Sequence, residues 1–269
     1  MLLKIRLLPA IAAAALCVPG LPRAQATPAV TLIHLPGGGL QPQAAVDSRG
    51  RVHVVYLSGE AASADVFYAT LDDAGRFSKP LQVNTQPGAA LATGTMRGGH
   101  LALGRGGRVH VAWHGSNQAP KVGDSHTVLY TRMNDARTGF EPDRSVVQQA
   151  VGLDAGTVAA DASGHVYVAW HAGLPGMKGE ADRRVFVAAS RDDGATFAPQ
   201  AAASPASTGA CGCCGVGAFA DVRDGLFVLY RAAIASTRRD TYALSSRDGG
   251  TTFSATSLQR WDINACPMS

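Results

Sequence analysis

The chain has 269 residues, of which 46% are hydrophobic, and carries 24 lysines and arginines against 20 aspartates and glutamates. A formal net charge of +4 is small for this length and predicts neither a nucleic-acid-binding surface nor one for anionic membranes. Glycine is abundant, at 31 residues, and aromatic residues make up 6%, a composition typical of a globular protein with many turns.

The first 26 residues are typical of a secretory signal peptide. Lys4 and Arg6 form a basic start, residues 7–18 are apolar but too few to span a bilayer comfortably, and small residues around Ala26 suit a cleavage point. Their removal would lower the net charge to +1. We therefore expect residues 27–269 to be exported to the periplasm or secreted, without a membrane span, into a compartment that permits disulfides.

A ten-residue pattern recurs four times in the remaining chain. It occurs as DSRGRVHVVY at 47–56, GRGGRVHVAW at 104–113, DASGHVYVAW at 161–170 and DVRDGLFVLY at 221–230. The terminal aromatics Tyr56, Trp113, Trp170 and Tyr230 are 57, 57 and 60 residues apart. A fixed period of this size is the signature of a repeat architecture.

Each repeat is predicted to contain four short strands. The expected first strands are residues 43–46, 101–103, 158–160 and 218–220, and each second strand ends at the terminal aromatic. The expected third strands are 66–70, 128–131, 185–190 and 242–246, followed by fourth strands such as 81–84 and 146–149. Four-stranded units that repeat in this way are typical of the blades of an all-β propeller.

The two ends of the chain bear on closure of such a ring. Residues 30–33 are expected to be an orphan fourth strand that completes the final blade. Residues 264–269 fall where a fifth blade would begin. Four blades and the start of a fifth indicate an incomplete five- or six-bladed ring, and we expect the domain to be truncated at its C-terminus.

A turn motif between the third and fourth strands carries a family resemblance. SRDDGATF at 190–197 and SRDGGTTF at 246–253 match Ser-x-Asp-x-Gly-x-x-aromatic, and TLDDAGRF at 70–77 is a degenerate copy. The chain thereby resembles the Asp-box (BNR) repeat propellers of the sialidase-like superfamily. The motif residues are expected to hold tight turns rather than to bind ligand; they are Ser190, Asp192, Gly194, Phe197, Ser246, Asp248, Gly250 and Phe253.

In such a fold, the loops after the second strands and the connections between blades share the face around the channel mouth, where ligands usually bind. His114, His171 and Arg231 follow the strand-two aromatic in three successive repeats. The arginine pairs at 183–184 and 238–239 are more typical of solvated loop charges. The candidate ligand-binding residues are Arg97, His100, His114, Asp154, His171, Arg231, Arg239 and Asp240.

Four cysteines remain after residue 26, at Cys211, Cys213, Cys214 and Cys266. One interpretation is a disulfide that ties the fourth unit to the next, with a connectivity that the sequence leaves open. The alternatives are a soft-metal site for Cu or Zn, since thiolates suit both ions, and a redox role.

The resemblance implies glycosidase activity, but the catalytic set of sialidases is not found. The chain has no Arg-Ile-Pro motif and only three glutamates, Glu60, Glu141 and Glu180. The leading hypothesis is an exported propeller that binds a glycan or small polar ligand, and hydrolyses it if catalytic residues are present. The alternatives are a non-enzymatic propeller for a protein or polysaccharide partner, and a metal- or thiol-dependent periplasmic protein.

Overall fold

A computed structural model describes residues 30–94, 97–223, 225–235 and 237–263. The chain divides into two compact units, Met1–Ile33 and His34–Ser269, and all regular elements that are described lie in the second. The predicted signal peptide, Cys266 and the predicted start of a fifth blade lie outside the described residues. No helix within the described residues is long and apolar enough to cross a membrane.

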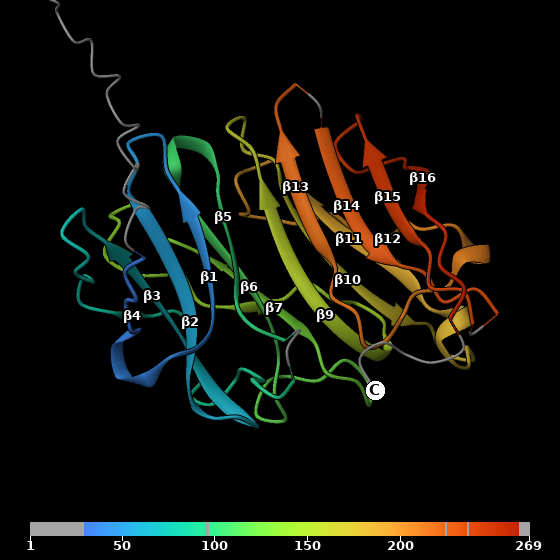
Figure 1. Cartoon of the computed structure of the whole chain (residues 1–269), viewed down its shortest axis with the longest axis horizontal. Helices are drawn as coiled ribbons and strands as arrows, with labels where there is room; N and C mark the ends of the chain where they lie inside the picture. Colours follow the sequence, from blue (N-terminus) through green and yellow to red (C-terminus); the bar gives the residue numbers. More distant parts are fainter. Residues whose placement is uncertain (1–29, 95–96, 224, 236, 264–269) are drawn as a thin grey trace, which may run out of the picture. The chain divides into compact units, whose positions relative to one another are not determined.

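The described strands form four sheets of four strands each (Figure 1). The strands of the first sheet are β1 (Leu40–Val46), β2 (Val52–Glu60), β3 (Ser63–Leu71) and β4 (Leu81–Gln82). Those of the second sheet are β5 (His100–Leu103), β6 (Val109–His114), β7 (Val128–Arg132) and β8 (Arg144–Ser145).

The third and fourth sheets repeat the same plan. The strands of the third are β9 (Val151–Ala160), β10 (Val166–Gly173), β11 (Arg184–Ser190) and β12 (Ala201–Ala202). Those of the fourth are β13 (Gly217–Asp221), β14 (Gly225–Arg231), β15 (Thr241–Ser246) and β16 (Ser254–Gln259). The described residues also form four short 3-10 helices, one before β1 at Pro36–Gly38 and three between strands, at Arg105–Gly107, Glu180–Asp182 and Ala206–Thr208.

Every strand pairs antiparallel with its neighbour in the chain, so each sheet is a simple meander. The first strands β1, β5, β9 and β13 contact one another in succession at the inner edges of their sheets (Figure 1). The prediction of an all-β fold built from four-stranded repeats is therefore confirmed. The number of blades in a closed ring stays a prediction.

Apolar side chains pack between successive sheets and form three clusters. The strand-two aromatics Trp113, Trp170 and Tyr230 each belong to a different cluster and are at most 3% exposed. β-branched and aromatic residues on paired strands suit this half-buried, pleated environment. Tyr56 instead packs in a smaller fourth cluster against Leu35.

Three expected strands differ from the structure, the first being β4, which ends at Gln82 rather than at residue 84. The predicted fourth strand at 146–149 begins earlier, as β8. The amide of Val146 still pairs with the Val128 carbonyl at 3.2 Å, but the next amide, of Val147, donates to Ser145 Oγ at 3.2 Å. Because the Val147 amide is bonded to a side-chain hydroxyl, it does not pair with the neighbouring strand, and the strand ends there.

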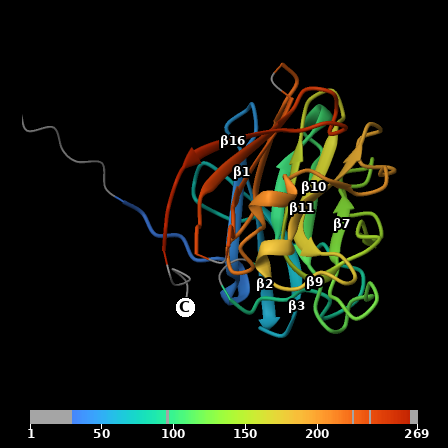
Figure 2. The same ribbon diagram turned by 90° about the vertical axis from the view of Figure 1, so that its right-hand side faces the viewer.

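The predicted orphan strand at 30–33 is wrong, because these residues adopt no strand and Val30 and Leu32 are 89% and 83% exposed. The fourth sheet needs no such strand, since β16 follows β15 in the chain and already forms its outer edge (Figure 2).

The two Ser-x-Asp-x-Gly turns have matching hydrogen bonds. Ser190 Oγ donates to Asp192 Oδ1 at 2.7 Å and accepts from the Gly194 amide at 2.9 Å. Thr196 donates to Asp192 from its amide at 2.9 Å and from its hydroxyl at 2.7 Å. Ser246, Asp248, Gly250 and Thr252 repeat these contacts. In both turns the aspartate therefore serves the backbone of its own loop.

These contacts make the turn sensitive to acid. Burial alone would raise the pKa of Asp192, but hydrogen bonds from Thr196 and Ser190 outweigh it and lower the pKa to about 2. A carboxyl whose pKa is lowered on folding stabilises the fold fully above its unfolded pKa of 3.8, and that stabilisation is lost as the pH falls toward 2. We expect Asp192→Asn to lower the urea midpoint at pH 6, and the difference to shrink by pH 2.5. A difference that does not change over this range would contradict the assignment.

Candidate functional site

The loops that follow each second strand share one face with the connections that lead into β5, β9 and β13. We call this the connection face; the Ser-x-Asp-x-Gly turns lie at the opposite ends of the strands. Strand pairing explains the grouping, because an antiparallel meander brings the end of the second strand beside the start of the first. His171, near the end of β10, is the register partner of Asp154, near the start of β9.

Arg97 and Asp154 form a bidentate ion pair on this face. Arg97 Nε donates to Asp154 Oδ1 and Nη2 donates to Oδ2, both at 2.8 Å. Asp154 precedes Ala155, whose φ of 48° belongs to an irregularity where β9 pairs with β10. Burial would raise the pKa of Asp154, but the hydrogen bonds and charge of Arg97 lower it. Asp154 is therefore a carboxylate at neutral pH.

Two buried histidines lie next to this pair. His114 Nε2 is 3.8 Å from Asp154 Oδ1, and both ring nitrogens face backbone carbonyls, of Gly115 at 3.0 Å and of Leu153 at 3.3 Å. Burial lowers the pKa of His114. The imidazole is thus expected to be neutral, and its ring contacts His126 at a centroid distance of 5.2 Å.

The tautomer of His171 follows from its two partners. Nε2 lies 3.0 Å from the Cys214 carbonyl, which can only accept, and Nδ1 lies 3.3 Å from Nη1 of Arg183, which can only donate. His171 must therefore be neutral, with its proton on Nε2. Burial and the positive charge of Arg183 together lower its pKa to about 4.

This assignment predicts the titration of His171. Because the folded pKa lies below the unfolded value of 6.5, His171 should stay uncharged from pH 8 to 5 and take up a proton only near pH 4. Protonation would lose the acceptor for Arg183, so stability should decline as the pH falls from about 6.5 toward 4. Imidazole nitrogen shifts measured by NMR check this directly, and a midpoint near 6.5 would refute it.

The β10–β11 loop adds a second ion pair. Glu180 Oε2 pairs with Arg239 Nη1 at 2.7 Å, and Oε1 accepts the Gly212 amide at 2.5 Å. Burial would raise the pKa of Glu180, but these contacts outweigh it and lower the pKa. Asp240 has a supporting role, since it accepts hydrogen bonds from Arg238 and from the Trp261 amide.

Two other predicted residues have different surroundings. The guanidinium of Arg231 stacks over the Trp261 ring at 4.5 Å, and its buried Nη1 has no hydrogen-bond partner in the described structure. His100 lies on β5 and its Nδ1 is 3.4 Å from Gln43 Nε2 of β1. Among the described residues, no hydrogen bond or ion pair joins His100 to the other predicted site residues.

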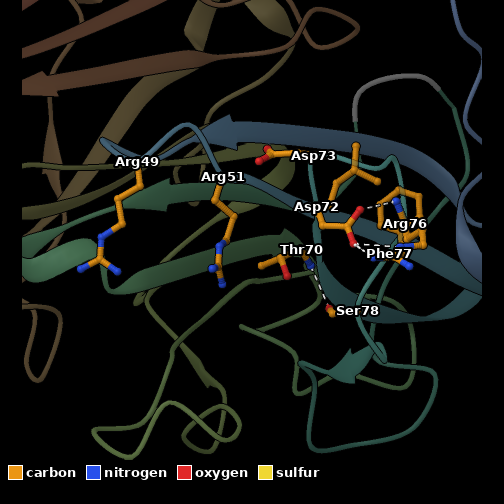
Figure 3. A pocket seen from close by; sticks show the side chains of 9 residues that line it. Arg49, Arg51, Thr70, Asp72, Asp73, Arg76, Phe77 and Ser78 are labelled. Carbon is orange, nitrogen blue, oxygen red and sulfur yellow. Dashed lines mark hydrogen bonds and ion pairs between the residues drawn. The ribbon is translucent and has the colours of Figure 1, made fainter.

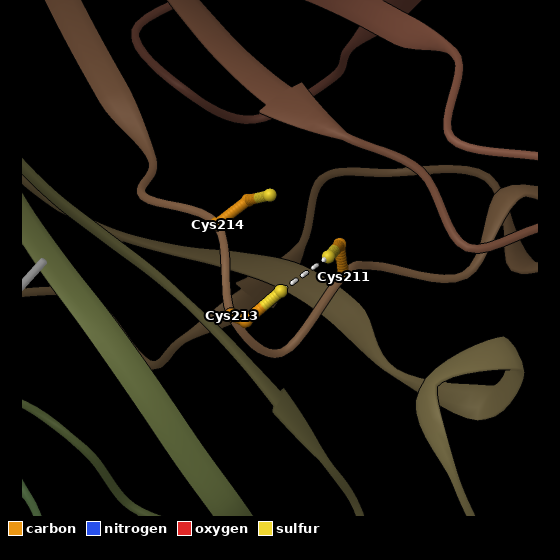
Figure 4. A group of neighbouring side chains, drawn as sticks. All are labelled: Cys211, Cys213 and Cys214. Atoms are coloured by element: carbon orange, nitrogen blue, oxygen red, sulfur yellow. Dashed lines mark hydrogen bonds between the residues drawn. The ribbon is translucent and has the colours of Figure 1, made fainter. Parts of the chain in front are cut away.

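Three cysteines share one turn of this face, just before β13. Figure 4 shows their side chains converging, and the three sulfur atoms lie within 4.8 Å of one another. Cys211 and Cys214 are free thiols, and Cys213 Sγ is 3.3 Å from Cys211 Sγ. A hydrogen bond from Cys214 lowers the pKa of Cys211 to about 6 and raises that of Cys214. The disulfide to Cys266 stays a prediction.

The arginine pair at 183–184 was predicted to be solvated loop charge, and for Arg183 this prediction is wrong. Its guanidinium is held by His171 and lies close to two glycines. A Cβ on Gly212 would stand 2.7 Å from Nη1, and a Cβ on Gly152 would stand 3.0 Å from Nη2. Arg183 and Glu180 line a pocket of about 130 Å³ between the start of β9 and the β10–β11 loop. No motif marks Arg183, because its partners come from distant segments.

Two arginines of the connection face lack a carboxylate partner. The ion pairs Arg97–Asp154 and Glu180–Arg239 are internally neutral. Arg183 and Arg231 have no carboxylate within ion-pair distance among the described residues. Two guanidiniums without a carboxylate at ion-pair distance suit an anionic ligand, and a guanidinium matches a planar carboxylate in shape.

A larger pocket, of about 350 Å³, lies at the opposite strand ends of the first sheet (Figure 3). Arg49, Arg51, Asp72 and Arg76 point around it, but all four side chains are exposed and Asp72 is already paired with Arg76 at 3.0 Å. Solvated charges of both signs make a weaker binding site than the partly buried guanidinium of Arg183.

Comparison with known proteins gives a likeness of fold only. No family model matches the sequence, and no curated protein matches it. The structure resembles a polysaccharide lyase described as an ulvan lyase, with a TM-score of 0.55 at 15% identity over 84% of this chain, which spans 57% of that protein. It also resembles an α-L-arabinanase from Penicillium chrysogenum, with a TM-score of 0.53 at 11% identity, covering 84% of this chain and 68% of that one.

A fungal lectin from Aleuria aurantia, described as a six-bladed β-propeller, matches with a TM-score of 0.48 at 11% identity, over 81% of this chain and 58% of the lectin. Four-stranded antiparallel sheets whose first strands contact one another in succession give the chain a propeller-type fold, and the lyase and the arabinanase resemble it in fold. Fold alone does not fix a function, which depends on the site.

Proposed function

We propose that this protein binds an acidic glycan on its connection face, with Arg183 contacting a carboxylate of the sugar. The observation that carries the proposal is the placement of Arg183: its guanidinium contacts a neutral histidine beside a pocket, and no described carboxylate lies within ion-pair distance of it. A preset guanidinium loses little side-chain entropy when it binds an anion, which favours affinity. The lyase and the arabinanase among the structural neighbours support a glycan as the class of ligand.

Binding is better supported than hydrolysis. Glycoside hydrolysis by two carboxyl groups requires one with a raised pKa that can donate a proton to the leaving oxygen. On the connection face the pKa values of Asp154 and Glu180 are both lowered, and each carboxylate is paired with an arginine. The two ionised carboxylates, of Asp154 and Glu180, are suited to position arginines and the cysteine turn rather than to transfer protons.

The proposal is tested by calorimetric titration with a galacturonic acid trimer and with its methyl-esterified counterpart, which lacks the charge. A charge-assisted hydrogen bond contributes about 1.5–3 kcal/mol. We therefore expect esterification, and separately Arg183→Ala, to weaken binding by about 10- to 100-fold. Affinity should also fall as salt is added.

Arg49→Ala is the matched control, because it removes an exposed arginine from the larger pocket and leaves the connection face intact. Its affinity should stay within about twofold of the parent, a change of about 0.4 kcal/mol. The proposal fails if Arg183→Ala binds the acidic trimer as well as the parent protein does, or if the ester binds equally well. A galactose trimer that binds as tightly would favour a neutral glycan instead.

We also propose that residues 1–26 direct export. The support is the sequence of this segment alone, with its basic start, apolar stretch and small residues near Ala26. Expression of the full chain in a Gram-negative host should give periplasmic protein whose first residue is Thr27. Recovery of the uncleaved chain in the cytoplasm would count against export.

A further inference from the structure

The turn of residues 211–214 carries two free thiols that the glycan site does not use. Cys211 is buried and Cys214 is partly exposed, and their sulfur atoms belong to the cluster that spans no more than 4.8 Å (Figure 4). With metal–thiolate bonds of about 2.3 Å, a linear S–metal–S unit spans about 4.6 Å. Sulfurs within 4.8 Å of one another are close enough to bind the same metal ion.

Contacts with the rest of the protein hold this turn in place. The Cys211 amide donates to the Arg231 carbonyl at 2.9 Å, and the Cys214 carbonyl accepts from His171 at 3.0 Å. The intervening amide of Gly212 donates to Glu180 at 2.5 Å. Because three backbone groups of the turn are fixed from outside, the two thiols are presented together at little further entropic cost.

The side chains of Glu180 and His171 next to the turn offer no free metal ligand, so only sulfur atoms remain as ligands. Both carboxylate oxygens of Glu180 are engaged, one by Gly212 and one by Arg239. Both ring nitrogens of His171 are engaged as well, one by Cys214 and one by Arg183. A tetrahedral zinc site would need such groups as third and fourth ligands. Two thiolates alone suit a soft monovalent ion, for which thiolate is the preferred ligand.

Charge favours the same ion. Two thiolates with one Cu(I) carry a net charge of −1. The positive charges of Arg231 and Arg239 act on Cys214, and the positive charge of Arg239 and the negative charge of Glu180 act on Cys211. Attraction to a nearby fixed cation stabilises such an anionic complex. We propose that Cys211 Sγ and Cys214 Sγ form a binding site for one copper(I) ion. This site goes beyond the proposed glycan binding and does not depend on it.

The test is an anaerobic titration of the full chain, purified without a thiol reductant, with Cu(I), in competition with the chromophoric chelator bicinchoninate. We expect the parent protein to withdraw one Cu(I) per chain, and Cys211→Ser and Cys214→Ser each to weaken binding at least 100-fold. Cys213→Ser changes a neighbour on the same turn, and its affinity should stay within threefold. Since Cys211 is buried, far-UV circular dichroism checks that each variant folds. If Cys211→Ser does not fold, Cys214→Ser, at the more exposed position, provides the same test.

Three results would overturn the proposal. The first is a parent protein that leaves all Cu(I) with the chelator. The second is a Cys213→Ser variant that loses as much affinity as Cys214→Ser, which would mean that the two named sulfurs do not make the site. The third is displacement of Cu(I) by an equimolar amount of Zn(II), which would contradict a site of two ligands, since zinc requires four. Glycan binding by the same preparations, measured in parallel, keeps failure of this site distinct from failure of the proposed function.

Discussion

Replacement of Gly194 by alanine should cost about 3 kcal/mol or more of unfolding free energy. Gly194 has a φ of +78°, where a residue with a Cβ is strained by about 1–2 kcal/mol. A Cβ at this position would also stand 1.7 Å from Tyr130 Oη. Tyr130 is fully buried and its hydroxyl contacts His110 Nδ1 at 2.8 Å, so the ring has little room to retreat. Overpacking of this kind adds about 1–3 kcal/mol.

Gly107→Ala separates backbone strain from the clash. Gly107 has a φ of +71°, but a Cβ added there would have no neighbouring atom within 4 Å, so only the strain of about 1 kcal/mol is expected. Urea unfolding of both variants measures the difference. An equal loss of unfolding free energy in Gly194→Ala and Gly107→Ala would contradict the predicted clash between a Cβ at position 194 and Tyr130.

Removal of Arg97 should have the second large effect. Arg97→Ala leaves Asp154, which is only 9% exposed, as a carboxylate without its bidentate partner. Breaking a buried pair in this way costs about 3–5 kcal/mol, and we expect the lower end because the Arg97 side chain keeps 30% exposure. The matched control is Arg76→Ala, whose 79% exposed side chain pairs with Asp72 and should contribute less than about 1 kcal/mol.

The Arg97 variant should also respond differently to pH. Without the arginine, burial is expected to raise the pKa of Asp154 above its usual value. Protonation then removes the unpaired charge, so the stability deficit relative to the parent should shrink as the pH falls from 7 to 4. In the parent protein the pKa of Asp154 is lowered, so the contribution of this carboxylate to stability is lost on acidification. A deficit that grows toward pH 4 would argue against a buried carboxylate held by Arg97.

The repeat period was enough to predict the sheets. Tyr56, Trp113, Trp170 and Tyr230 mark equivalent strands because each unit buries the same face against a neighbour, and packing enforces that spacing. Strand ends were harder to predict. The hydroxyl of Ser145 ends β8 before Val147, a local competition for one amide that hydrophobic patterning does not reveal.

The candidate site residues were predicted from strand ends, and the structure describes the contacts among them. Asp154 and His171 lie together because the antiparallel register pairs them. The role of Arg183 could not be predicted, since it depends on the tautomer of His171 and on close approach to Gly152 and Gly212. Such side-chain geometry follows from loop conformations that no repeat pattern encodes.

A crystal structure of the protein with a galacturonic acid oligomer tests the central claim most directly. We predict a sugar carboxylate on the connection face, within about 3 Å of the Arg183 guanidinium nitrogens. A sugar bound instead beside Arg49 and Arg51, in the pocket of the first sheet, would contradict the account.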